Sequence, residues 1–106
     1  MIRDTQPLMM NRQTELFRFS GDVSDPDFLD WICHRANRLG LNGWVREDSA
    51  GGFIEALASG PEELLDAMEL GCSLGPITVW VETVERCPHD SDGPMPNGFK
   101  ILTQAD

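Results

Sequence analysis

Two amphipathic helical patterns, each flanked by strand patterns, constrain the fold of this chain more than any other feature. Apolar residues recur at helical spacing over residues 25–40 and again over residues 60–72, so each segment predicts a helix with one buried stripe. The segments around them predict four strands and a short terminal strand, at residues 13–20, 41–47, 53–58, 77–87 and 99–103. This order predicts an α/β sandwich of the ferredoxin-like βαββαβ type, with an antiparallel sheet, two helices on one face and a short extra C-terminal strand.

Local signals mark the ends of both helices. Asp25 and Pro26 precede the first apolar stripe, and proline suits a first helical position because its missing N–H has no partner there. Gly40 follows the stripe and predicts a left-handed cap that ends the helix. Residues 60–63 read Gly-Pro-Glu-Glu and open the second helix with acids that complement the helix dipole.

Length and composition fit one folded domain. The chain has 106 residues, of which 41% are hydrophobic, and this is enough for a single core. Residues 1–12 show no clean periodicity and predict an N-terminal tail, while residues 13–106 predict the domain. We find no repeat or linker that would divide it.

The charge balance excludes two classes of partner. Lys and Arg number 8 against 18 Asp and Glu, which gives a formal net charge of -10. A nucleic-acid binder must neutralise phosphates with clustered cations, and an anionic membrane surface attracts basic segments, so we expect neither nucleic acid nor membrane as a partner. A basic protein partner or a cation remains compatible with this charge.

Cysteine usage and the apolar runs predict the compartment. No basic segment followed by an apolar stretch opens the chain, and no apolar run approaches the roughly 20 residues of a membrane helix. The chain has three cysteines, an odd number, and no Cys-x-x-Cys motif. This pattern favours free thiols at Cys33, Cys72 and Cys87. We therefore expect a cytoplasmic protein without a cofactor.

Two segments of the chain resemble the acylphosphatase family. Residues 20–29 read Ser-Gly-Asp-Val-Ser-Asp-Pro-Asp-Phe-Leu, and residues 39–47 read Leu-Gly-Leu-Asn-Gly-Trp-Val-Arg-Glu. The family pattern is Ser-Gly-Arg-Val-Gln-Gly-Val-x-Phe-Arg, followed later by Leu-Gly-Leu-x-Gly-Trp-Val-Arg-Asn. The resemblance implies the same ferredoxin-like fold and a loop after the first strand that cradles an acyl phosphate with backbone N–H groups.

The two catalytic positions of that pattern are not matched. The resemblance places the phosphate-binding Arg at Leu29 and the water-orienting Asn at Glu47. A leucine can neither donate a hydrogen bond nor neutralise an anion, and a carboxylate cannot donate an amide hydrogen bond at neutral pH. Loss of one preorganised donor costs about 10²–10³ in rate, so the resemblance leaves open whether the chain is an enzyme.

The equivalent of the phosphate loop has also become acidic. It comprises Asp22, Val23, Ser24, Asp25, Pro26, Asp27 and Phe28. The family's loop glycine is absent, and the proline removes one candidate N–H donor. Each of these changes opposes anion binding.

The loop carboxylates have a structural and a functional interpretation. Asp25 precedes a proline at a helix start, and Ser24 with Asp27 resembles a capping box, so we expect Asp25 and Asp27 mainly to cap the helix. Alternatively, Asp22, Asp25, Asp27 and Glu47 converge on Ca²⁺ or Mg²⁺, although their spacing matches no standard calcium loop. A substitute cation for phosphate is conceivable at Arg18, but we expect Arg18 and Arg46 to pair with surface acids.

Trp80 is the best candidate for an interaction surface. Alternation in the last long strand places Ile77, Val79 and Val81 on one face and Thr78 and Trp80 on the other. If the first face meets the helices, Trp80 lies exposed on the open face of the sheet, where it suggests a protein partner or a homodimer.

Two functions follow from the sequence. One is an acylphosphatase-like domain that no longer hydrolyses acyl phosphates and acts as a small binding or regulatory module. The alternative is a divergent acylphosphatase that hydrolyses carboxylic–phosphoric anhydrides with a substitute cation, and only in that case is a small acyl phosphate its partner.

Overall fold

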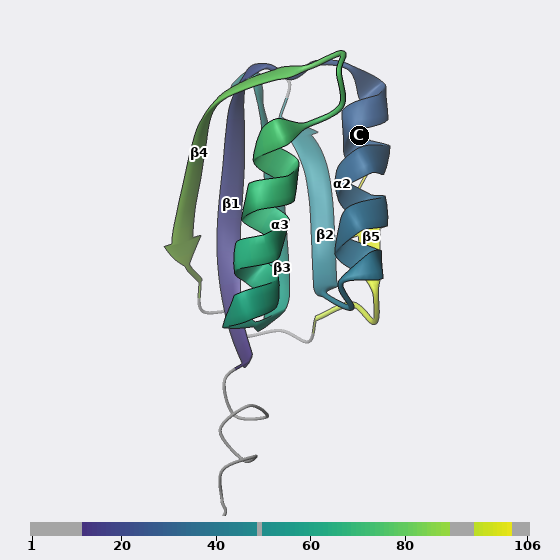
Figure 1. Ribbon diagram of the computed structural model, residues 1–106, viewed down its shortest axis with the longest axis vertical. Helices are drawn as coiled ribbons and strands as arrows, with labels where there is room; N and C mark the ends of the chain where they lie inside the picture. The colour runs from purple at the N-terminus through teal and green to yellow at the C-terminus, as the bar shows by residue number, and fades with distance from the viewer. Residues whose placement is uncertain (1–11, 49, 90–94, 103–106) are drawn as a thin grey trace, which may run out of the picture.

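Two helices cover one face of a five-stranded sheet in the computed structural model, which describes residues 12–48, 50–89 and 95–102 (Figure 1). In chain order the elements are β1 (Arg12–Asp22), α2 (Pro26–Arg38), β2 (Asn42–Asp48), β3 (Phe53–Pro61), α3 (Glu62–Leu74), β4 (Trp80–Pro88) and β5 (Phe99–Ile101). The predicted ferredoxin-like βαββαβ order, with a short C-terminal strand, is confirmed.

The strands lie in the order β4-β1-β3-β2-β5. β1 pairs antiparallel with both β3 and β4, and β2 pairs antiparallel with β3. β5 pairs in parallel with β2, with Phe99 opposite Gly43, so the short extra strand makes the sheet mixed at one edge. The loop after β1 and the β2–β3 hairpin can therefore meet across neighbouring strands.

Aromatic side chains join the sheet to the helices. Phe17 and Phe19 on β1 are buried, and their rings stack at a centroid distance of 6.1 Å. Phe28 on α2 meets Phe19 edge to face at 6.2 Å. Ile32 on α2 and Leu65 on α3 are buried in the same core. Each such side chain contributes about 1.5–3 kcal/mol on burial, so the packing fixes α2 firmly over β1.

The ends of α2 agree with the sequence prediction. Asp25 is the N-cap and Pro26 is the first helical residue. Leu39 is the C-cap, and Gly40 follows with φ of 76°, a left-handed conformation that favours glycine. The predicted cap at Gly40 is thus confirmed.

Within the described part of the chain, no helix has the length and apolar character needed to cross a membrane.

β4 begins later than the sequence predicts. The strand starts at Trp80, and Ile77 is 100% exposed instead of facing the helices. The Val79 N–H donates to the Pro76 carbonyl at 3.1 Å, which closes a turn and keeps Ile77 and Thr78 off the sheet. Of the three residues predicted to face inward, Val79 is buried, and Val81 packs partly buried against the core.

The other boundaries differ by smaller amounts. β3 continues through Gly60 and Pro61, which pair with Gln13 and Arg12, although this Gly-Pro pair predicted the start of a helix. Arg12 belongs to β1, and the remainder of the predicted N-terminal tail, residues 1–11, lies outside the described residues. The end of the predicted terminal strand, Thr103, also lies outside them.

Candidate functional site

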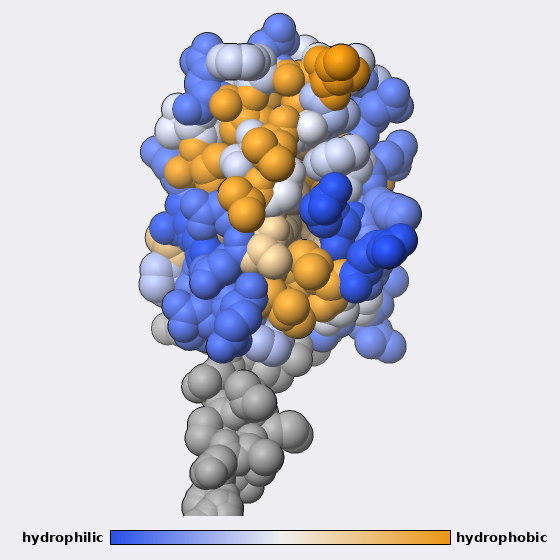
Figure 2. Space-filling model, in the orientation of Figure 1, coloured by the Kyte–Doolittle hydropathy of each residue, from blue (hydrophilic) through white to orange (hydrophobic). Residues whose placement is uncertain are grey.

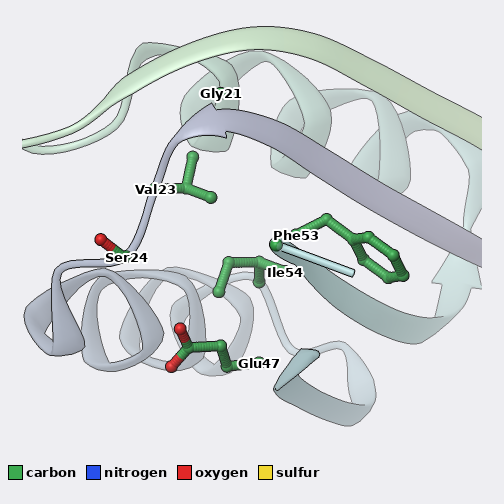
Figure 3. Close-up of a pocket in the computed structure, with 7 residues that line it drawn as sticks. Gly21, Val23, Ser24, Glu47, Phe53 and Ile54 are labelled. Carbon is green, nitrogen blue, oxygen red and sulfur yellow. The ribbon is translucent and has the colours of Figure 1, made fainter. Parts of the chain in front are cut away.

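A small pocket lies where the loop after β1 meets the β2–β3 hairpin (Figure 3). Its volume is about 150 Å³. The described residues that line it come from three segments: Gly21, Val23, Ser24, Glu47, Gly52, Phe53 and Ile54. The structure therefore brings Glu47 of β2 to the loop that follows β1.

A bulge at the end of β1 shapes the entrance to this loop. The pairing of β1 with β4 shifts register between Ser20 and Gly21. Gly21 has φ of 132°, and a Cβ there would lie 2.4 Å from the Trp80 carbonyl oxygen. Only glycine allows the two backbones to approach this closely, so the bulge fixes where the chain leaves the sheet.

Pairing between β2 and β3 sets the opposite wall. Glu47 lies opposite Ile54, and Asp48 lies opposite Phe53. The Gly52 N–H donates to the Asp48 carbonyl at 2.8 Å and closes the hairpin. The Glu47 side chain extends past Ile54 toward the loop that carries Ser24 (Figure 3). A carboxylate thus lies on this side of the pocket.

The amino end of α2 holds a carboxylate of the chain itself. Asp25 Oδ1 accepts a hydrogen bond from the Asp27 N–H at 2.9 Å. A hydrogen bond with the Thr78 side chain and the bond from Asp27 lower the pKa of Asp25 below its ordinary value. The predicted capping role is confirmed for Asp25, while Asp27 contributes its backbone N–H and an acidic side chain in the first turn.

The remaining loop residues serve packing or face solvent. Val23 and Phe28 are buried in the core, at 3% and 0% exposure. Asp22 and Ser24 are exposed, and Pro26 occupies the first helical position. Leu29 is partly buried and packs against the hydrophobic core; it is not among the residues that line the pocket.

The two candidate cations, Arg18 and Arg46, do not line the pocket. Arg18 donates to Glu55 at 3.3 Å, and Arg46 donates to the same carboxylate at 2.6 and 3.0 Å. The Arg18 guanidinium also lies 4.5 Å from the centre of the Phe53 ring. Neither arginine lines the pocket, and no lysine or arginine is among its described lining residues.

The prediction that Arg18 and Arg46 pair with surface acids is only partly confirmed, because the partner they share, Glu55, is buried. Arg18 also approaches the exposed Glu85 at 4.0 Å, as expected of a surface pair, but Glu55 is only 7% exposed. Arg18 and Arg46 lie on the strands either side of Glu55, directly opposite it, and cover its carboxylate. A buried charge requires such pairing, so this cluster explains why both guanidinium groups are held away from the loop.

The structure does not assemble the four predicted metal-ligand carboxylates. Of Asp22, Asp25, Asp27 and Glu47, only Glu47 lines the pocket. Among the described residues, no group of three or more His, Cys, Asp or Glu side chains is placed to hold a metal ion. The donor set therefore does not fit Ca²⁺, which takes six to eight oxygen ligands.

Trp80 is exposed, as the sequence predicts. Its exposed fraction is 70%, and it lies opposite Asp22 at the end of the β1–β4 pair. Its neighbour Val81 packs toward the core, so alternation directs Trp80 away from the helices.

Sequence reasoning missed several residues of the site. The turn signal of Gly51-Gly52 was visible, but the arrival of Gly52, Phe53 and Ile54 at the loop depends on strand pairing across the sheet. Thr78 carries no local signal at all, because its contact with Asp25 joins segments distant in the sequence.

Comparisons with known proteins identify the family. The acylphosphatase family model matches residues 16–101. The chain is 40% identical over 76 residues to an acylphosphatase of Rhodospirillum rubrum, covering 72% of this chain and 82% of that protein. It is 36% identical over 91 residues to an acylphosphatase of Rhizobium meliloti, covering 86% and 94%. The solved structure of an acylphosphatase from Coxiella burnetii superimposes with a TM-score of 0.79 at 22% identity, over 89% of this chain and 96% of that one, and shows the same fold. The chain belongs to the acylphosphatase family.

Proposed function

We propose that this acylphosphatase-family domain has lost acyl phosphate hydrolysis and acts as a small binding or regulatory module. One observation carries this function: the pocket at the loop presents the Glu47 carboxylate and, among its described lining residues, no cation. Phosphoryl transfer depends on positive charge placed around the transferred group. None of the described lining residues supplies it.

The carboxylate that caps the start of α2 also opposes the binding of an anion. A free helix N-terminus offers N–H groups and a partial positive charge to an anion. Here the Asp25 carboxylate accepts the Asp27 N–H and adds a negative charge in the same place. Like charges at this helix end repel each other. An incoming phosphate dianion would meet both this carboxylate and Glu47.

Titration with inorganic phosphate tests this function at the loop. Amide chemical shifts of residues 21–28 should stay unchanged in the wild-type protein up to millimolar phosphate. The Leu29→Arg/Glu47→Asn double variant restores the family's cation and amide, and serves as the matched comparison. Saturable shifts of the wild-type loop amides would show that the site still binds phosphate and would contradict the proposal.

The second candidate function is a divergent acylphosphatase for carboxylic–phosphoric anhydrides. The names of the relatives at 36–40% identity favour it. It requires a substitute cation, and Arg18, which lies over the Phe53 ring, would have to leave Glu55 to reach the pocket. Activity of the wild type that disappears in Arg18→Gln would support this function.

The binding module would meet a protein partner or a second copy through the open sheet face near Trp80. Its 70% exposure supports this surface, and the net charge of -10 supports a basic partner instead of nucleic acid or an anionic membrane. All three cysteines are free, which supports a cytoplasmic location.

A further inference from the structure

A second, larger cavity lies along α2 and shares no lining residue with the loop pocket among the described residues. Its volume is about 360 Å³, and the described residues that line it are Trp31, His34, Arg35 and Arg38. These residues recur at spacings of three and four, so they form one stripe along the helix. Figure 2 views the helical layer and shows strongly hydrophilic side chains over α2 beside hydrophobic ones along α3.

The arginines of this cavity differ from those of the sheet. Arg18 and Arg46 pair with Glu55, and Arg86 pairs with three carboxylates. Arg35 and Arg38, by contrast, make no ion pair with any other described residue. In a chain whose acids exceed its bases by ten, these two exposed guanidinium groups lie together at one cavity and are available to an external anion.

Packing holds one of these guanidinium groups in place. The Arg35 guanidinium lies 4.8 Å from the centre of the Trp31 ring, at a cation–π distance. Trp31 is itself half-buried against the core. On the neighbouring helix α3, Gly71 leaves room for the arginine stem, because a Cβ there would lie 2.6 Å from Arg35 Cδ. The aromatic ring and the charge are therefore preorganised side by side.

The helix dipole explains only part of this arrangement. Arg35 and Arg38 lie in the last turn of α2, where cations are favourable. The dipole accounts for positive charge at these positions. It does not account for the cavity, for the seating of Arg35 on Trp31 or for the glycine that makes room for it.

We propose that this cavity binds a small organic anion, a carboxylate or phosphate monoester attached to a planar apolar group. Arg35 and Arg38 would bind the charged head through paired N–H donors, and the Trp31 ring would contact the planar body. His34 adds a further donor at the rim. The cavity volume lies near the lower end of the range for small-molecule sites, which is roughly 300–1,000 Å³. This site is separate from the loop pocket and does not depend on whether acyl phosphate hydrolysis is lost.

Titration of the full chain with three probes tests the site. Benzoate and phenyl phosphate carry the two candidate heads on the same ring, and benzamide is the neutral control. We expect saturable shifts of the amides of residues 31–38 with at least one anion and none with benzamide; the tighter of the two anions identifies the head group. Absence of saturation with both anions, or equal shifts with benzamide, would overturn the proposal.

Matched variants locate the binding. Arg35→Gln and Arg38→Gln should each weaken binding by about tenfold, as expected for loss of a charge-assisted hydrogen bond. Lys100→Gln removes the same charge from an exposed position on β5 and should leave the affinity unchanged. Gly71→Ala keeps every charge but displaces the Arg35 stem, so it should also weaken binding. Wild-type affinity in both arginine variants would overturn the proposal, as would an equal loss in Lys100→Gln.

Discussion

Asp25 and Asp27 form the bond that closes the amino end of α2, with Asp25 Oδ1 accepting the Asp27 N–H at 2.9 Å. In the family pattern this end of the helix faces the phosphate. Here the chain supplies the negative charge itself, and Glu47 brings a second carboxylate to the adjoining pocket. The fold and the helix start are therefore those of the family, and a carboxylate of the chain lies at each of these two places.

The Asp25 cap makes stability depend on pH. Because the pKa of Asp25 is lowered from 3.8 by Thr78 and Asp27, the ionised cap stabilises the fold above that value, and this contribution is lost as the pH falls through the folded-state pKa. Asp25→Ala should lower the thermal midpoint at neutral pH, and the gap from wild type should narrow below pH 3.8. Thermal unfolding followed by circular dichroism across pH measures this gap.

Two further variants control that prediction. Asp25→Asn keeps a capping oxygen without a titrating charge, so its stability should lose this part of the pH dependence. Asp27→Ala removes the same charge but leaves the backbone N–H that binds Asp25, and should cost less. A gap between Asp25→Ala and wild type that is constant with pH would contradict the assigned role of the ionised cap.

Arg86 is predicted to stabilise the contact between β4 and α3. It binds Glu15 on β1, and its Nη1 lies 2.7 Å from Asp66 and 2.8 Å from Glu69 of α3. The side chains of Arg86 and Glu15 are only 17% and 12% exposed. Arg86→Met leaves Glu15 without its partner and should lower the free energy of unfolding by about 3 kcal/mol, as for other largely buried pairs.

A double-mutant cycle in urea separates the pair from simple packing. Glu15→Gln/Arg86→Met should lose less stability than the sum of the two single variants, because neither change then strands a buried charge. Additive losses would show that the two side chains do not act as a pair.

The three cysteines should differ widely in reactivity. Burial raises the pKa of the Cys72 thiol to about 12, and burial together with Asp30 raises the pKa of Cys33. Cys87 is exposed. Because the thiolate is the reactive form, a thiol reagent at pH 8 should modify Cys87 first, Cys33 more slowly and Cys72 only after unfolding. Mass spectrometry of the labelled peptides gives the order, and early labelling of Cys72 would contradict its placement in the core.

The sequence predicted those parts of the fold that local patterns determine. Apolar spacing located both helices, and Asp25, Pro26 and Gly40 marked the ends of the first one. The start of β4 was wrong because the alternation of Ile77, Val79 and Val81 suits a strand, whereas a turn closed by the Pro76 carbonyl removes the first of them from the sheet. Local patterns do not report that bond.

Features that depend on contact between distant segments could not be predicted from the sequence. No local pattern marks Glu55 as buried or paired, yet the two neighbouring strands bring Arg18 and Arg46 onto it and bury it. The close approach of the Arg35 stem to Gly71 of α3 likewise depends on how the two helices dock. Strand register and helix docking create both features, and neither feature produces a recognisable residue spacing in the sequence.

Turnover of acetyl phosphate by the purified wild-type protein tests the central claim most directly, with the Leu29→Arg/Glu47→Asn variant beside it and circular dichroism to show that both are folded. The proposed loss of hydrolysis predicts that the wild type releases phosphate no faster than buffer. Wild-type turnover above that background, abolished when the protein is unfolded, would contradict the proposed loss of hydrolysis.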